Sequence, residues 1–203
     1  ASSYVDVLVY SFGDITATAN GSGYSSAVAV SIDSLAGDIF FYNGGNIVAT
    51  GADQAVAVEL YGAGSTLLIN DGLIAAYADA YGGIAFRSGD ADDSVLNYGT
   101  IVGSFVTGDG DDALLNAYGA YWYSFGVSDF GDGDDAIVNY GTIVLSDSII
   151  DLGLPGASGN SFVNYGLITV SGDNIIDMEG GSASLAFAAA LAATPEPLAS
   201  SNP

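Results

Sequence analysis

The sequence contains no cysteine and no histidine, and its only basic side chain is that of Arg87. Without Cys or His there can be no Ser–His–Asp triad, no thiol nucleophile and no Cys/His zinc site. Nucleic-acid binding needs several Lys or Arg to neutralise phosphates, and a Walker-type phosphate loop needs a Lys. An anionic membrane surface would also repel a chain whose formal net charge is −23. These absences leave carboxylate chemistry, calcium binding or a role without catalysis.

Long apolar runs and long charged side chains are scarce as well. No stretch reaches the roughly 18 uninterrupted apolar residues of a membrane-spanning helix, so we predict no membrane insertion. Among 24 acidic residues only Glu59, Glu179 and Glu196 are Glu. The others are Asp, which together with 29 Gly indicates turns rather than exposed helices. Half of the 203 residues are hydrophobic, enough for the core of one domain or one elongated array.

The chain begins with Ala1-Ser2-Ser3 rather than Met. Removal of a signal peptide would leave such a start, although a trimmed chain would begin in the same way. Trypsin-like proteases would find almost nothing to cut in a chain with one Arg and no Lys. We therefore predict an extracellular or cell-surface location after removal of a signal peptide.

A short anchor recurs along nearly the whole chain: an apolar pair, Asn, any residue, Gly, any residue and Ile. The Asn of the five clear copies, and its equivalent in two degenerate copies, are Asn43, Asn70, Asn97, Asn139 and Asn164, with Ser11 and Asn116. Successive anchors lie 19 to 32 residues apart, from 116 minus 97 to 43 minus 11. A single Asn-x-Gly indicates only a turn, but seven copies in series indicate a repeat architecture.

Each repeat is expected to contain a strand, an Asn-Gly corner, a second strand, a loop, a third strand and a Gly/Asp corner. Apolar residues alternate with small ones in the two-residue period of strands, and no helical period occurs before residue 184. We predict an all-β fold, a parallel β-solenoid (β-helix) of about seven rungs, in residues 1–183. Equivalent residues would stack in ladders, and buried Asn side chains would hydrogen-bond from rung to rung.

The repeat resembles the secreted, repeat-rich passenger regions of bacterial autotransporter-type adhesins. Two segments carry this resemblance: GDADDSVLNYGTI at 89–101 and GDGDDAIVNYGTI at 131–143. The resemblance implies a parallel β-helix, an extracellular location, and a role in adhesion or in building a surface structure.

Three acidic corners are the clearest candidates for a metal site. They contain Asp90, Asp92, Asp93, Asp109, Asp111, Asp112, Asp132, Asp134 and Asp135. If the rungs stack, nine carboxylates lie along one edge without Lys partners, and Ca²⁺ is the cation that clustered carboxylates suit. GDGDDAI also resembles a calcium-binding nonapeptide, but tandem copies nine residues apart are absent. Solvated turns and weak, stabilising calcium sites both remain open, and we expect Arg87 to pair with Asp90 or Asp92.

Aromatic residues supply candidate interaction surfaces. One is an expected ladder of Tyr98, Tyr140 and Tyr165 beside the Asn corners. The other is the segment 118–125, which contains Tyr121, Trp122 and Tyr123. This segment is interpreted either as a bulged rung that buries Trp122 and Phe125 or as an exposed patch for a surface glycan or a subunit.

Two other functions that parallel β-folds support are disfavoured. A hydrolase would use a pair of carboxylates as acid and base, but a catalytic pair should be unique whereas the Asp clusters repeat. Ice binding calls for regular Thr arrays, and only Thr100 and Thr142 share a ladder position. We predict no enzymatic activity.

The two ends are the expected assembly sites, because an open end of a solenoid is an unpaired strand edge. Residues 184–203 form a small, apolar C-terminal segment and a Pro-containing tail, which would either cap the last rung or pair with a neighbouring subunit. The candidate assembly residues are Tyr4, Val5, Val7, Val9, Leu185, Phe187 and Leu191. The predicted function is structural: self-association end to end into a fibre or surface coat. The alternative is a monomeric adhesin that binds a glycan or host surface through an aromatic face.

Overall fold

The computed structural model describes residues 6–21, 24–79, 82–153 and 159–178, together with the backbone of 186–187. Regular structure in these residues consists of β-strands. Every strand pairing among them is parallel. No helix in the described ranges is long and apolar enough to cross a membrane. The predicted all-β class with parallel strands is confirmed.

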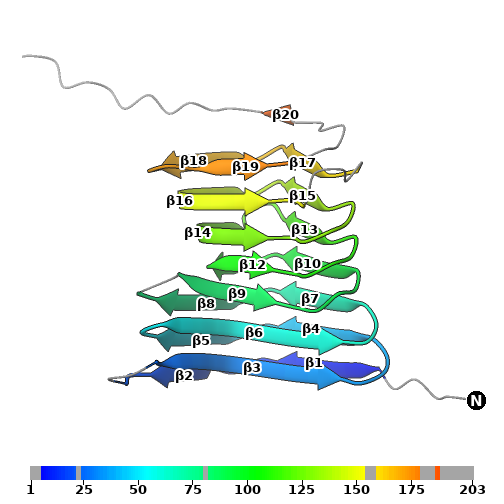
Figure 1. The fold of residues 1–203 in the computed structure, drawn as a ribbon, viewed down its shortest axis with the longest axis vertical. Coiled ribbons are helices and arrows are strands. Elements are labelled where there is room, and N and C mark those ends of the chain that lie inside the picture. The colour runs from blue at the N-terminus through cyan, green and yellow to red at the C-terminus, as the bar shows by residue number, and fades with distance from the viewer. Residues whose placement is uncertain (1–5, 22–23, 80–81, 154–158, 179–185, 188–203) are drawn as a thin grey trace, which may run out of the picture.

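The strands form two sheets that face each other across the core (Figure 1). The eight-stranded sheet contains, in spatial order, β1 (Val7–Ser11), β4 (Ile39–Asn43), β7 (Thr66–Asn70), β10 (Asp93–Asn97), β13 (Ala113–Asn116), β15 (Ala136–Asn139), β17 (Ser161–Asn164) and β20 (Ala186–Phe187). The twelve-stranded sheet contains β2 (Ile15–Ala19), β3 (Ser26–Ser34), β5 (Asn46–Gly51), β6 (Gln54–Gly62), β8 (Leu73–Ala78), β9 (Gly83–Arg87), β11 (Thr100–Val102), β12 (Ser104–Val106), β14 (Tyr121–Asp129), β16 (Thr142–Asp151), β18 (Leu167–Ser171) and β19 (Ile175–Asp177).

Consecutive strands form layers that stack in sequence order along one axis (Figure 1). The seven layers are β1–β3, β4–β6, β7–β9, β10–β12, β13–β14, β15–β16 and β17–β19. The anchors predicted from the repeat pair in register from Ser11 to Asn164, one in each layer. At the far end, Phe187 of β20 takes the next position beside Asn164.

Close stacking of the layers explains the Asn-x-Gly spacing that recurs in the five clear anchors. The Gly of one corner lies directly on the corner of the previous layer, and a Cβ on Gly72 would lie 1.9 Å from the carbonyl oxygen of Gly45. Only glycine fits such a contact. Between corners, strand alternation sends one set of side chains into a continuous core. The inward column Ile47, Ile74, Ile101, Trp122 and Ile143 is fully buried.

Candidate functional site

A ladder of Asn side chains runs through the interior at the first corner. Asn43, Asn70, Asn97, Asn116, Asn139 and Asn164 are all buried. From Asn43 to Asn139, each side-chain Nδ2 donates to the Oδ1 of the next Asn, at 2.6 to 2.9 Å. Asn97, for example, also donates to the Tyr121 carbonyl at 3.0 Å and accepts from the Gly99 N–H at 3.2 Å. The predicted buried Asn ladder is confirmed, and its polar groups are paired as burial requires.

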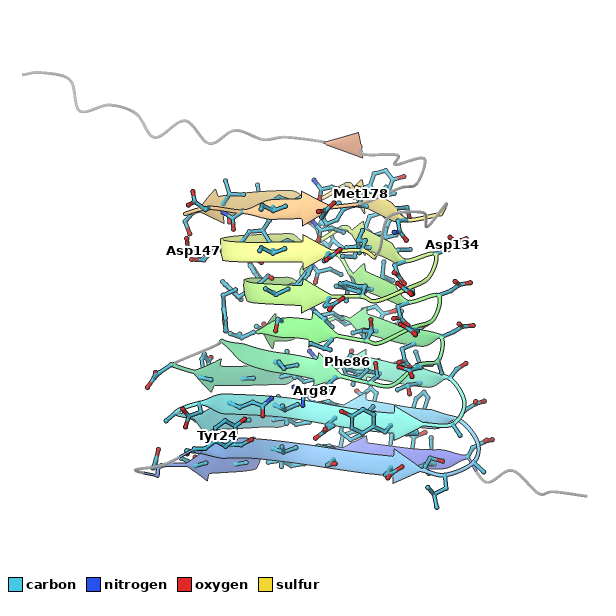
Figure 2. All side chains as sticks on the ribbon, viewed as in Figure 1. Tyr24, Phe86, Arg87, Asp134, Asp147 and Met178 are labelled. Carbon is cyan, nitrogen blue, oxygen red and sulfur yellow. The ribbon has the colours of Figure 1, made fainter. Side chains whose placement is uncertain are left out.

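The acidic corners are divided into exposed and buried carboxylates rather than aligned along one edge. Asp90, Asp92, Asp109, Asp111, Asp132 and Asp134 are exposed. Figure 2 shows Asp134 at the outer margin of the stacked corners. Asp93, Asp112 and Asp135 are instead at most 2 % exposed. The expectation of nine carboxylates on one edge is therefore wrong, because strand alternation turns every third one into the core.

The buried carboxylates form a second ladder. Asp93 Oδ1 accepts the N–H of Thr66, Asp112 Oδ1 accepts that of Asp93, and Asp135 Oδ1 accepts that of Asp112, at 2.8 to 2.9 Å. Asn160 takes the next position and accepts the N–H of Asp135 at 2.7 Å. The second oxygen, Oδ2, of each of the three carboxyls is buried without a hydrogen-bond partner.

Burial raises the pKa of Asp93 to about 6 and the pKa values of Asp112 and Asp135 to about 7. Loss of hydration is the main cause, because it penalises the charged form. The backbone N–H groups of Thr66, Asp93 and Asp112, which donate to Asp93, Asp112 and Asp135, act in the opposite direction. These carboxyls are thus partly neutral near pH 7, and a neutral carboxyl can occupy the same position as the amide of Asn160.

The arrangement does not favour the expected calcium edge. Among the described residues, no group of three or more acidic side chains is placed so that it could hold a metal ion. The nearest arrangement is an open groove beside Gly131 and Gly153, lined by Asp109, Asp129, Asp132 and Asp151. Two of these carboxylates already accept hydrogen bonds from the backbone: Asp129 from the Gly131 N–H and Asp151 from the Gly153 N–H.

Arg87 does not pair with the acidic corner that follows it. Its Nη1 lies 3.8 Å from Oε1 of Glu59, and the expectation of a salt bridge to Asp90 or Asp92 is wrong. Glu59 and Arg87 are register partners on β6 and β9, so the stacking of layers brings them together. Figure 2 shows Arg87 beside Phe86, whose side chain is in the core.

The predicted Tyr ladder is interrupted. Tyr140 and Tyr165 stack with ring centroids 5.0 Å apart and lie exposed in adjacent layers. Tyr98 occupies the same position two layers earlier, but Ala117 stands between it and Tyr140. The repeat that begins at Asn116 is degenerate at this position, and the continuous stripe is reduced to one Tyr pair and one isolated Tyr.

The segment 118–125 buries Trp122 and leaves its neighbours Tyr121 and Tyr123 exposed. Trp122 is fully buried, packs edge-on against Phe105 at 5.1 Å, and donates from Nε1 to the Gly103 carbonyl at 3.0 Å. Side chains of β14 alternate between inward and outward, and Trp122 pairs in register with the inward residues Ile101 and Ile143. Trp122 therefore cannot belong to a patch that faces a ligand. The neighbouring Tyr121 and Tyr123 are exposed and stack on each other at 6.1 Å.

Tyr123 borders an open groove of about 390 Å³. It is lined by Tyr77, Val102, Tyr123, Ser124, Phe125, Val144 and Ser146. The strand register shifts between Ser124 and Gly126, where Phe125 is left half-buried. The predicted bulge therefore exists, and it opens a partly aromatic groove on the surface.

The predicted assembly residues lie at or beyond the ends of the described structure. Val7 and Val9 belong to β1 in the first layer and are half-buried. Phe187 belongs to β20, which pairs with β17 as a continuation of the eight-stranded sheet. Tyr4, Val5, Leu185 and Leu191 lie outside the described residues.

An uncharged outer face of the eight-stranded sheet was not predicted. The residue before each anchor faces outward, and it is always apolar or aromatic: Tyr10, Tyr42, Ile69, Leu96, Leu115, Val138 and Val163. The signal is present in the sequence, because an apolar pair before an inward Asn must place one member inside and one outside.

Comparison with protein-family models, with curated proteins and with solved structures finds no match for the chain. The resemblance to autotransporter passenger repeats rests on the two segments that carry it.

Proposed function

We propose that the seven layers are the rungs of a parallel β-solenoid, and that this solenoid is an extracellular, non-enzymatic structural protein that stacks end to end into fibres or a surface coat. The observation that supports this proposal is that the strands of the middle layers are paired on both sides, whereas strands of the two end layers are not. In each end layer, described strands have a neighbour on one side only: β1, β2 and β3 at one end, β18 and β19 at the other.

The inward column of Ile47 shows the same contrast. Its middle members, Ile47 to Ile143, are fully buried. Its end members, Ile15 and Ile168, are only partly buried against the core. An unpaired parallel edge with exposed core is a template for another parallel edge.

Stacking the last layer of one copy on the first layer of the next is a heterologous contact that does not close. Such contacts generate filaments rather than rings. The repeated corners favour this role over catalysis, because each carboxylate cluster recurs from layer to layer. The GDGDDAIVNYGTI resemblance and the shortage of trypsin sites support an extracellular location.

Substitution Ile15→Lys is expected to abolish end-to-end assembly, because it places a charge in the exposed core of the first layer. Negative-stain electron microscopy at about 0.15 M salt, where surface charges are screened beyond about 8 Å, should show long filaments of the unmodified chain and only short rods of the variant. Thr16→Lys is the matched control, since Thr16 is the exposed neighbour on the same strand. Isolated rods of the unmodified chain at high concentration would overturn the proposal, and repetition in EDTA shows whether calcium takes part.

A glycan-binding adhesin is the second candidate, favoured by the groove beside Tyr123. Aromatic faces stack on sugar rings. If this function is correct, Tyr123→Ala should lower binding on a glycan array by at least about tenfold, whereas Tyr98→Ala, on another face, should leave it unchanged. A glycan array on which the unmodified chain binds nothing would remove this candidate.

A further inference from the structure

The outward side chains in the strands of the eight-stranded sheet are uncharged, although the protein is highly charged. Two columns of these side chains run along the outer face of the sheet from β1 to β17. They are Leu8, Phe40, Leu67, Ser94, Ala113, Ala136 and Ser161, and Tyr10, Tyr42, Ile69, Leu96, Leu115, Val138 and Val163. None of these positions is charged, although the formal net charge of the chain is −23.

The two margins of this face differ chemically. Along the margin before the strands run the exposed residues Asp6, Asp38, Ser65, Asp92, Asp111 and Asp134. Along the margin after the strands run Phe12, Gly44, Asp71, Tyr98, Ala117, Tyr140 and Tyr165. One margin therefore presents hydrogen-bond acceptors and negative charge, and the other presents mostly aromatic rings and phenol donors.

We propose that this face pairs with the same face of a second copy, with the two rods side by side and parallel, related by a two-fold axis along the rod. Parallel sheets are usually covered on both faces, and here the described residues cover only the inner one. Seven strands spaced ~4.8 Å apart and about 20 Å wide would bury roughly 1,300 Å² between two copies. That area lies at the low end of the range for stable, specific interfaces.

The charges of the margins select the orientation. A two-fold axis along the rod brings the acidic margin of each copy against the aromatic margin of the other. A two-fold axis along the strands would instead place the two acidic margins against each other, which like charges disfavour. The axis along the rod also keeps each residue at its own height, so that Asp92 faces Tyr98 of the second copy and Asp134 faces its Tyr140.

A contact within one copy shows that this chemistry is available. The Tyr42 hydroxyl donates to Asp71 at 2.6 Å, across two adjacent layers on the same surface. Beside the acidic margin lies a groove of about 570 Å³, with Leu8, Phe40 and Leu67 among its lining residues and Asp92 and Ser94 at one end. In the proposed pair, the ring of Tyr98 from the second copy reaches this end of the groove.

This pairing does not depend on end-to-end stacking, and the test keeps the two apart by using Ile15→Lys in every chain. Sedimentation at about 0.15 M salt should show a dimer of this parent. Adding Leu96→Lys, which places a charge in the middle of the face, should weaken the dimer at least about 100-fold. Val106→Lys is the matched control, because Val106 is an equally half-buried outward side chain of the same layer on the other sheet. The proposal would be overturned if the Ile15→Lys parent were monomeric. It would also be overturned if Leu96→Lys and Val106→Lys weakened the dimer equally while the circular dichroism of both stayed unchanged.

Cysteine cross-linking tests the orientation, since the chain has no cysteine of its own. A mixture of Asp92→Cys and Tyr98→Cys chains should form a mixed disulfide dimer under mild oxidation, and Asp92→Cys alone should not. Because β10 lies in the fourth of the seven layers, a two-fold axis along the strands would place Asp92 opposite Asp92. Efficient cross-linking of Asp92→Cys alone would therefore refute the parallel arrangement.

Discussion

Replacing Asp93, Asp112 and Asp135 together by Asn is expected to raise the melting temperature at pH 8 by about 10 °C or more and to leave it nearly unchanged at pH 4. Each of these carboxyls has a raised pKa in the folded protein because burial removes its hydration. In the unfolded chain the same groups titrate near pH 4. Between these values the folded state binds more protons than the unfolded state, so the free energy of unfolding falls as the pH rises.

The pH dependence of the unmodified protein follows with a definite sign. These three groups do not lower the stability below about pH 4, where they are neutral in both states. Their ionisation lowers the free energy of unfolding as the pH rises from there through about 6 to 7, their folded-state pKa values. One pKa unit corresponds to about 1.4 kcal/mol, so three groups together cost several kcal/mol at pH 8. The charges that face them, on Asp92, Asp111, Asp129 and Asp134, add to this cost.

Asparagine is a conservative replacement at these positions because Asn160 already occupies the next one. The Oδ1 of Asn160 accepts the backbone N–H of Asp135, as each buried Asp accepts the equivalent N–H of the layer before it. The Nδ2 of Asn160 donates to the Leu152 carbonyl. The control is Asp90→Asn, Asp109→Asn and Asp132→Asn, which removes three exposed carboxylates of the same corners that are not among the charges facing the buried carboxyls. The control should change the melting temperature little between pH 5 and 8. Thermal melts that are independent of pH in this range for the unmodified chain would contradict the prediction.

Substitution Asn97→Ala is expected to lower the free energy of unfolding by about 4 kcal/mol or more, and to lower the melting temperature by about 10 °C. It removes four hydrogen bonds in the interior, two donated and two accepted by the same side chain. The Oδ1 of Asn116 is then buried without the hydrogen-bond donor that Asn97 supplies, and the Nδ2 of Asn70 loses its bond to the next layer. Each such group costs about 1–3 kcal/mol.

Denaturant unfolding followed by circular dichroism measures this effect. Asn46→Ala is the matched control: Asn46 is exposed at the same kind of corner, and its Nδ2 donates to Asp14. It should cost less than about 1 kcal/mol. Asn97→Asp separates the two halves of the ladder contact, because Asp keeps the acceptor and loses the donor. Equal stability of Asn97→Ala and Asn46→Ala would mean that the ladder contributes nothing specific.

Some surface features could have been predicted from the sequence by counting from each anchor. Residues an even number of positions before an inward Asn also point inward, which places Asp93, Asp112 and Asp135 in the core and Asp92, Asp111 and Asp134 outside. The same parity assigns Leu96 and its equivalents to the outer face. The prediction grouped the Asp residues of each corner into one acidic cluster. It therefore missed the difference between buried and exposed carboxyls, the raised pKa values of the buried ones and the uncharged face.

Other features depend on which layers become neighbours. Arg87 pairs with Glu59, 28 residues earlier, because the repeat length sets which side chains stack. Ala117 interrupts the Tyr ladder because one degenerate repeat lies between two regular ones. The bulge at Phe125 and the groove beside Tyr123 arise where strands of unequal repeat length must share one sheet.

The sequence by itself determined the strand class, the seven anchors, their register and the buried Asn ladder, because a strict local pattern of apolar, Asn and Gly residues is repeated. The tertiary structure alone decided which carboxyls lose their hydration, which aromatic rings remain on the surface and which charges meet. Those properties depend on side chains from neighbouring layers, and the distance along the chain between such side chains varies from repeat to repeat.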